Sequence, residues 1–154
     1  MKTRATVLTL ALGLIAVAVS FASSPNMGTW KLNEAKSKVP AMAPKNNTVV
    51  YEAVGDKVKV TVDGTDAAGK PSHNEWTGKF DGKDYPLTGD PSADTRSYKK
   101  VDDRTTELTN KKAGKVTATG KIVISADGKS RTVTVSGIDP SGKKVEYTAV
   151  YDKQ

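Results

Sequence analysis

A glycine–lysine pair ends five short turns along this chain, and this repeat constrains the fold more than any other feature. The pairs are Gly69-Lys70, Gly82-Lys83, Gly114-Lys115, Gly128-Lys129 and Gly142-Lys143. A type I turn followed by a left-handed glycine connects two antiparallel strands in a tight β-hairpin. The last three pairs lie 14 residues apart, which leaves room for one strand and one turn in each interval. We therefore predict strands that pair with their neighbours in sequence order.

Apolar and polar residues alternate between these turns. Val58, Val60 and Val62, for example, are separated by polar residues. A period of two places one strand face in a core and the other in water, as in antiparallel sheets. In a later run the same pattern assigns one inward face to Val116, Ala118, Gly120, Ile122 and Ile124. The small residues of this face allow either tight packing or an empty space inside the fold.

Ten strands are predicted from the alternation and the turns. They are Gly28–Leu32, Asn47–Val54, Lys57–Asp63, Ser72–Phe80, Lys83–Thr88, Asp94–Val101, Arg104–Asn110, Lys115–Ser125, Arg131–Ile138 and Lys143–Asp152. A meander of this length closes on itself or splits into two packed sheets, and closure removes the exposed edges. We predict an all-β fold, an antiparallel up-and-down β-barrel of about ten strands. A two-sheet β-sandwich is the alternative, because it uses the same hairpins. One short helical turn is predicted at residues 33–38, with Asn33 as its cap.

The first 22 residues differ from the rest of the chain. Lys2 and Arg4 precede an apolar run from Val7 to Val19, and small residues follow around Ala22. This order is typical of a secretory signal peptide, and the run is too short to span a bilayer as a helix. We expect a signal peptide at residues 1–22, a short tail at 23–27 and a single β-barrel domain at 28–154. The short leader suggests a bacterial protein that is periplasmic or secreted and does not span the membrane.

The composition excludes several kinds of active site. The chain has no cysteine and one histidine, His73, so disulfides, thiolate nucleophiles and cysteine metal sites are ruled out. The turn aspartates lack the spacing of a calcium-binding loop. Gly64 and Gly69-Lys70 have the spacing of a phosphate-binding loop, but Pro71 stands where that loop has Ser or Thr. We expect no metal and no cofactor.

A catalytic relay is not expected either. A Ser–His relay would need Ser72 to approach His73, but adjacent residues in a strand point to opposite faces. We therefore predict that the protein is not an enzyme. An activity that disappears in a His73→Ala variant would contradict this prediction.

Lysines gather near the hairpins and alternate with acidic residues. The formal net charge is +7, or +5 without Lys2 and Arg4. Nucleic-acid binding usually needs a denser basic stripe with exposed stacking aromatics, so we expect no nucleic-acid partner. Lysines at turns and edges also keep strands from aggregating. A weak contact with an anionic envelope surface remains an alternative.

The residues Gly28-Thr29-Trp30 begin the first predicted strand. This resembles the Gly-x-Trp entry of lipocalins and related lipid-binding barrels, and the chain looks similar to exported bacterial lipocalin-like proteins of uncharacterised function. The resemblance implies a barrel in which Trp30 packs across the closed end from inside. Lipocalins place an arginine near the last strand against this tryptophan. Here Arg131 is the arginine nearest the C-terminus, one strand earlier, and the Thr-Asp-Tyr tripeptide of lipocalins is absent.

Aromatic residues on the inward faces are the best functional lead. A closed barrel of this size can enclose one small ligand. The residues expected to bind it are Trp30, Trp76, Phe80, Tyr85 and Tyr147. The sequence thus predicts a monomeric, exported, non-catalytic protein that binds a small apolar ligand inside the barrel. The alternative is a structural or interaction module of the cell envelope with a solid core and no ligand.

Overall fold

The computed structural model describes residues 24–139 and 141–154. The expected signal peptide and its cleavage point therefore lie outside the described residues. The described part contains ten strands and one short 3-10 helix. They are β1 (Gly28–Leu32), η2 (Glu34–Lys36), β2 (Lys45–Val54), β3 (Lys57–Thr65), β4 (Pro71–Gly78), β5 (Tyr85–Thr88), β6 (Thr95–Lys100), β7 (Thr105–Lys112), β8 (Lys115–Ile124), β9 (Ser130–Ile138) and β10 (Lys144–Lys153).

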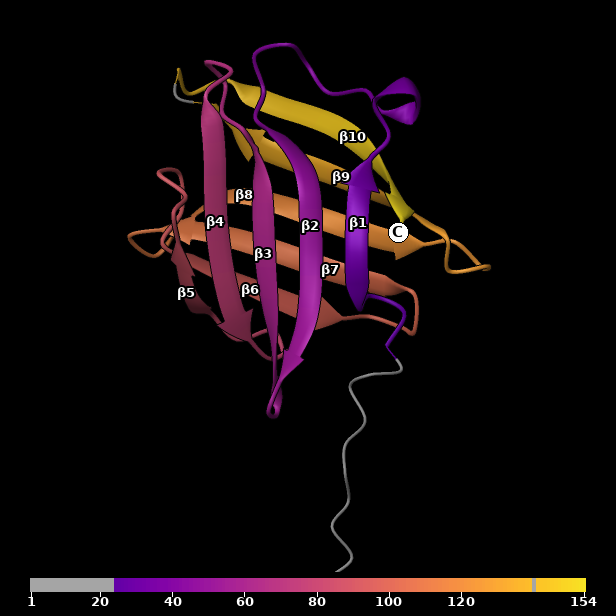
Figure 1. Cartoon of the computed structure of the whole chain (residues 1–154). Helices are drawn as coiled ribbons and strands as arrows, with labels where there is room; N and C mark the ends of the chain where they lie inside the picture. Colours follow the sequence, from indigo (N-terminus) through magenta and orange to yellow (C-terminus); the bar gives the residue numbers. More distant parts are fainter. Residues whose placement is uncertain (1–23, 140) are drawn as a thin grey trace, which may run out of the picture.

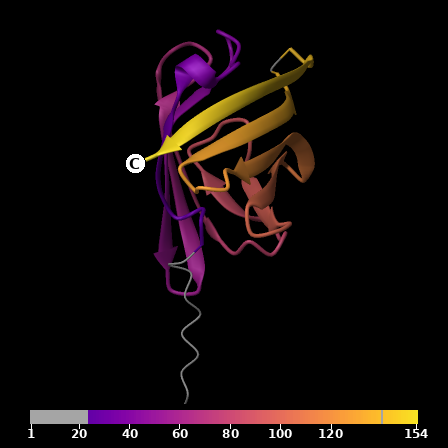
Figure 2. The same ribbon diagram turned by 90° about the vertical axis from the view of Figure 1, so that its right-hand side faces the viewer.

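The ten strands form a closed antiparallel barrel in which neighbours in sequence are neighbours in space. β1 closes the ring, because Trp30 lies opposite Val49 of β2 on one side and Lys153 of β10 on the other. Figure 1 shows β1–β4 in front of β6–β10, and the turned view in Figure 2 shows the two walls facing each other. The predicted up-and-down barrel is confirmed, and the alternative β-sandwich is wrong.

The turns follow the chemistry that the glycine–lysine repeat predicts. Each glycine of the five pairs has a positive φ, between 71° and 84°, which a residue with a side chain rarely adopts. Before Gly142, the Oδ1 of Asp139 accepts hydrogen bonds from the backbone N–H groups of Ser141 and Lys143, both at 2.9 Å. The helical turn predicted at residues 33–38 is η2, and the side chain of Asn33 caps it.

Several strand ends differ from the prediction by one or two residues, and the facing of one residue is wrong. Residues 79 and 80 follow the end of β4, and residues 83 and 84 precede β5, which begins only at Tyr85, so none of these four is in a strand. Val116 does not face the core, because its exposed fraction is 53%. The register between β7 and β8 shifts next to Asn110, where a β-bulge places one extra residue in β8. One extra residue reverses the facing of every residue before it, so Val116 turns to the solvent while Ile122 and Ile124 remain buried.

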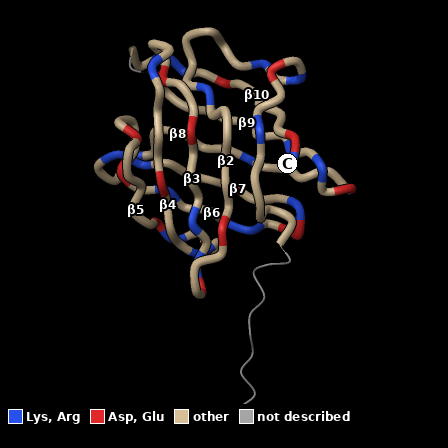
Figure 3. The backbone as a smooth tube through the Cα atoms, in the orientation of Figure 1, with Lys and Arg blue, Asp and Glu red and all other residues tan. Residues whose placement is uncertain are grey.

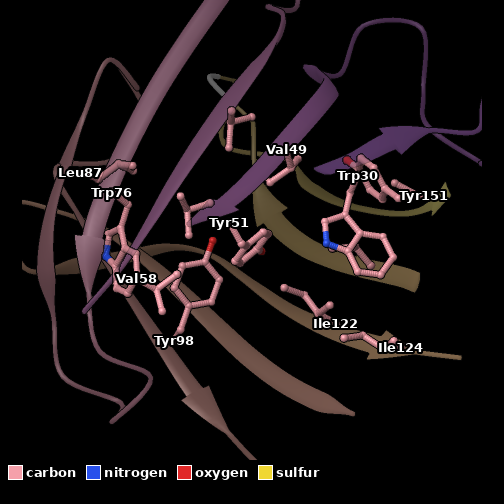
Figure 4. Packing of buried hydrophobic residues seen from close by; sticks show 14 of the residues in the cluster. Trp30, Val49, Tyr51, Val58, Trp76, Leu87, Tyr98, Ile122, Ile124 and Tyr151 are labelled. Carbon is pink, nitrogen blue, oxygen red and sulfur yellow. The ribbon is translucent and has the colours of Figure 1, made fainter. Parts of the chain in front are cut away.

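The barrel has two ends that carry different segments of the chain. The N-terminal end carries residues 24–27 and the β2–β3, β4–β5, β6–β7 and β8–β9 turns, and the opposite end, here called the far end, carries the other turns. The core runs between them and is lined by both walls (Figure 4). Its largest fully buried side chains are Trp30, Trp76, Ile124, Val60 and Thr106.

Charged residues of both signs are dispersed over the barrel. Figure 3 shows Lys and Arg scattered among Asp and Glu along the strands and turns. The ion pairs are short but exposed, for example Lys79–Asp56 and Lys111–Asp84, each at 2.7 Å. Exposed pairs of this kind contribute little to stability. The surface therefore has a mixed field, as the sequence predicted.

Candidate functional site

A hollow of about 520 Å³ opens at the N-terminal end of the barrel. It lies between residues 24–27, the β2–β3 turn, the segment that follows β4, and the β6–β7 turn. Its apolar wall is formed by Met27, Val58 and Phe80, together with the backbone of Gly78. Val58 faces inward on β3, and Phe80 lies two residues after the end of β4 and packs against the core cluster. The hollow can therefore accept an apolar group against a hydrophobic wall.

Charged residues rim this hollow, and they neutralise one another. Lys79 pairs with Asp56 at 2.7 Å, and Lys100 pairs with Asp103 at 2.9 Å. The hydrogen bond from Lys79 lowers the pKa of Asp56, and the same bond raises the pKa of Lys79. Both groups are thus charged and mutually satisfied at neutral pH. In the part of the chain that the structure describes, each of these four rim charges has a partner of opposite sign, so the rim does not favour an ionic ligand.

Phe80 lies at the edge of a cluster of aromatic side chains, on the side that faces the hollow. Its ring centroid lies 5.1 Å from that of Tyr98, 6.1 Å from that of Trp76 and 6.4 Å from that of Tyr51. Trp76 packs edge-on against Tyr98 at 4.7 Å, and its Nε1 donates a hydrogen bond to the backbone oxygen of Arg96 at 2.8 Å. Such contacts hold the rings in one arrangement. The wall of the hollow is therefore preorganised.

Tyr85 supports this cluster from β5. Its ring centroid is 5.7 Å from that of Trp76, and its hydroxyl donates to Oδ2 of Asp81 at 2.8 Å. The hydrogen bond to Asp81 raises the pKa of Tyr85. A Cβ added at Gly78 would lie 2.5 Å from the Tyr85 ring and 2.6 Å from the Trp76 ring. Gly78 is therefore the point where the two rings approach the backbone of β4, and no space remains there.

Trp30 lies deeper in the core and is fully buried. Its Nε1 donates a hydrogen bond to the backbone oxygen of Asn26 at 2.9 Å. The guanidinium carbon of Arg131 lies 4.8 Å from the Trp30 ring, 5.0 Å from that of Tyr51 and 4.9 Å from that of Tyr151. Arg131 comes one strand before the last, but the β9–β10 register places it directly opposite Tyr151. Arg131 therefore contacts Trp30 although it lies one strand before the last.

The five predicted ligand residues are not all together. Phe80 lines the hollow, with Trp76 and Tyr85 behind it, and Trp30 lies in the neighbouring core. Tyr147 lies apart on β10, where burial raises its pKa and the nearby Arg96 opposes that rise. Three further residues of this region, Met27, Val58 and Tyr98, were not predicted as ligand residues. The alternation could have identified Val58, but only the closed barrel brings these three to one place.

His73 lies on the outer face of β4 and not in the hollow. Its side chain is 54% exposed, and its Nδ1 lies 2.6 Å from Oδ1 of Asp63, which is directly opposite on β3. Its Nε2 lies 3.4 Å from Oε1 of Glu75. The hydrogen bond to Asp63 is the largest cause that raises the pKa of His73 above its usual 6.5.

This pairing predicts a pH dependence of stability. A raised folded-state pKa means that the stabilising contribution is complete below the unfolded-state pKa and is lost as the pH rises through the folded-state pKa. We expect the Tm difference between the wild type and His73→Gln to shrink from pH 5.5 to pH 8.5. Thermal unfolding at matched ionic strength measures it, with Asp63→Asn as the partner control. A difference that is constant over this range would contradict the pairing.

Two further findings concern the described residues alone. In residues 24–139 and 141–154, no group of three or more His, Asp or Glu side chains is placed to hold a metal ion. Within the same ranges, no helix has the length and apolar character needed to cross a membrane.

Comparisons with known proteins give few matches. No family model matches the chain, and no curated protein matches it. Among solved structures, it is similar to a redesigned β-barrel, mFAP1, bound to DFHBI. The two chains are 14% identical, the match covers 84% of this chain and 95% of that one, and the TM-score is 0.43.

Proposed function

We propose that this protein is a non-catalytic binding protein that takes a small apolar ligand into the hollow at the N-terminal end of its barrel. The hollow of about 520 Å³ with Phe80 on its wall is the observation that carries the proposal. Its volume is within the range of small-molecule sites, which are mostly apolar and largely formed before binding. The signal peptide expected at residues 1–22 is part of the same proposal and would place the protein in the periplasm or outside the cell.

The affinity would come from burial of apolar ligand surface. Each Å² of apolar surface removed from water contributes roughly 25 cal/mol before the costs of association. The aromatic cluster behind Phe80 reduces one of these costs, because its rings are already held by contacts with Tyr98 and Trp76. The paired charges at the rim would stay in water at the mouth. A neutral or weakly polar ligand fits this lining better than an ionic one.

Phe80→Ala is expected to weaken binding of the neutral fluorophore N-phenyl-1-naphthylamine about tenfold, which corresponds to about 1.4 kcal/mol. The substitution removes the ring that forms the wall, while the half-buried position of Phe80 limits the damage to the fold. Fluorescence titration measures the Kd, and circular dichroism checks folding. The control is Val123→Ala, an exposed residue on the outer face. The proposal fails if the wild type does not bind the probe, or if Phe80→Ala binds it as tightly as the wild type.

A second candidate function is an interaction module with a solid core. Two observations favour it. Glycines of the inner wall are covered by neighbouring side chains, since an added Cβ at Gly120 would lie 3.0 Å from Leu108. A smaller hollow of about 260 Å³ lies beside Val116 and Ile138, which are 53% and 60% exposed. Native mass spectrometry of protein purified without detergent separates the candidates. A bound mass that is released on unfolding supports a carrier, and a clean apo mass favours the module.

A further inference from the structure

The connector between β1 and β2 carries an exposed apolar loop at the far end of the barrel. The six residues of this apolar loop, 39–44, read Val-Pro-Ala-Met-Ala-Pro and include no charged side chain (Figure 3). Met42 is 79% exposed, and residues 40, 41 and 44 are exposed as well. The loop stands at the top of the barrel in both Figure 1 and Figure 2. Apolar residues that gather on a surface mark contact with a protein, a ligand or a membrane.

Backbone pairing holds the apolar loop on both sides. Before the loop, Lys38 forms an isolated bridge with Thr148 of β10, and its two backbone hydrogen bonds measure 2.7 and 3.2 Å. After the loop, Lys45 begins β2 and lies opposite Thr65 of β3. The loop is therefore anchored to β10 at one end and to β3 at the other.

A tight turn inside the apolar loop points its tip into the solvent. Val39 packs against the core cluster, and the backbone N–H of Ala43 donates a hydrogen bond to the backbone oxygen of Pro40 at 2.9 Å. This bond closes a β-turn with Ala41 and Met42 at its two corners, and both residues are exposed. The exposure of Met42 therefore follows from an ordered turn between anchored residues.

The two strands that anchor the apolar loop also bring lysine-rich turns to the same end of the barrel. The β3–β4 turn follows Thr65, and the β9–β10 turn precedes β10. Together with the connector, these segments (residues 33–45, 66–70 and 139–144) contain six lysines and three acidic residues, a formal net charge of +3. Across the mouth, Asp90 and Asp94 of the β5–β6 turn are balanced by Lys112 and Lys115 beside the β7–β8 turn. The positive charge is thus concentrated around the apolar loop.

The acidic residues of these three segments are held by their own neighbours. Glu34 pairs with Lys45 at 3.7 Å. Asp66 and Asp139 each accept two backbone hydrogen bonds within their own turns, all at 2.9 Å. Four lysines of these segments form no ion pair with an acidic side chain of the described chain: Lys36, Lys38, Lys70 and Lys143. Their ammonium groups can therefore meet an external anion.

An apolar loop between lysines matches the surface of an anionic bilayer. The apolar tip would leave water at the boundary between headgroups and acyl chains, and the lysines would stay at the level of the phosphates. A protein partner fits less well, because a stable interface takes roughly 20–30 residues from each side. The loop has six residues, and the lysines around it come from three separate segments. The phosphates of a bilayer have no fixed arrangement and can follow all of them.

We infer that the apolar loop docks the far end of the barrel on an anionic phospholipid bilayer, with Met42 inserted and the four unpaired lysines beside the phosphates. The hollow beside Phe80 opens at the opposite end of the barrel, so it would face away from the bilayer. The inference depends neither on the function proposed for that hollow nor on the expected signal peptide.

The test uses the absence of cysteine from the chain, which makes one introduced cysteine a unique labelling site. Met42→Cys carrying a nitrobenzoxadiazole label should show stronger, blue-shifted emission on vesicles of phosphatidylcholine with one-third phosphatidylglycerol. Val101→Cys is the matched control, because Val101 is an apolar residue that is 53% exposed in the β6–β7 turn at the opposite end. Its label should not respond. The same control tests the apolar run at residues 7–19, because binding through that run would bring the end that carries residue 24 to the vesicle.

The contribution of charge is measured by vesicle sedimentation. Lys36→Gln combined with Lys70→Gln should lower the partition coefficient at least about tenfold, the effect of losing two lysines near an anionic surface. The control is Lys57→Gln combined with Lys129→Gln, which makes the same change of charge at the opposite end and should cost less than about twofold. Salt at about 1 M, where the Debye length is about 3 Å, should release the wild type.

Three results would overturn the inference. The label at residue 42 fails to respond to the anionic vesicles, or the label at residue 101 responds in its place. Vesicles of pure phosphatidylcholine give the same response, which would show that the lysines do not contribute. The label at residue 42 responds to rising protein concentration without vesicles, which would identify a second copy of the chain as the partner.

Discussion

Replacement of Trp30 by alanine is expected to lower the free energy of unfolding by about 3–5 kcal/mol, the usual cost of removing a buried tryptophan. The side chain is fully buried, and its Nε1 donates a hydrogen bond to the backbone oxygen of Asn26 at 2.9 Å. It also forms one of the three rings around the guanidinium of Arg131. Chemical denaturation measures the change, and Met42→Ala, at a side chain that is 79% exposed, is the matched control with an expected change within about 0.5 kcal/mol.

The contact between Trp30 and Arg131 can be measured separately from burial. Trp30→Leu and Arg131→Met keep apolar volume at each position but remove the ring or the charge. A desolvated cation–π pair contributes about 2 kcal/mol, so we expect a coupling energy of about 1–2 kcal/mol in the double-mutant cycle. Arg131 is 3% exposed, and its Nε and Nη1 have no hydrogen-bond partner among the described residues. Additive single effects would show that the rings do not stabilise this cation.

The strands could be predicted because their signals are local. The glycine of each Gly-Lys pair adopts a positive φ, and the alternation between turns assigns the inward faces of β3, β4 and β10 correctly. Closure followed from the number of strands and the cost of exposed edges. The failure at Val116 has a local cause as well, since one extra residue at the β7–β8 bulge reverses the pattern. Nothing in the sequence near Val116 distinguishes this bulge from a regular strand.

The site could be predicted only in part, because it depends on which strands face each other across the barrel. Trp76 faces inward on β4, and Phe80, two residues after the end of that strand, lies 6.1 Å from it between ring centroids, so the alternation placed the two rings together. Arg131 reaches Trp30, and Tyr98 reaches Phe80, through pairings between distant strands that a single sequence does not specify. The burial of Arg96, which is 8% exposed, also depends on how distant strands close the barrel. A charged residue in an alternating strand resembles a solvent-facing residue until the barrel is closed around it.

Gly78→Ala is expected to destabilise the protein by about 2–3 kcal/mol through overpacking. The added Cβ would lie 2.5 Å from Cγ of Tyr85 and 2.6 Å from Cζ2 of Trp76. Neither atom is at the free end of a flexible chain, and Trp76 is 1% exposed, so both rings would have to move. Chemical denaturation measures the loss. Trp76 fluorescence should change as well, because the ring would lose its packing against Tyr98.

Gly120→Ala is the matched control, since it adds the same methyl group to the opposite wall. There the nearest atom is Cγ of Leu108 at 3.0 Å, and a leucine can change its rotamer. We therefore expect Gly120→Ala to cost less than half as much as Gly78→Ala. If the two variants lost the same free energy of unfolding, both walls would accommodate the added methyl group equally well, and the aromatic cluster would not be rigid. The ligand site that we propose beside Phe80 depends on a rigid cluster, because a wall that rearranges freely would lose the advantage of a site formed before the ligand arrives.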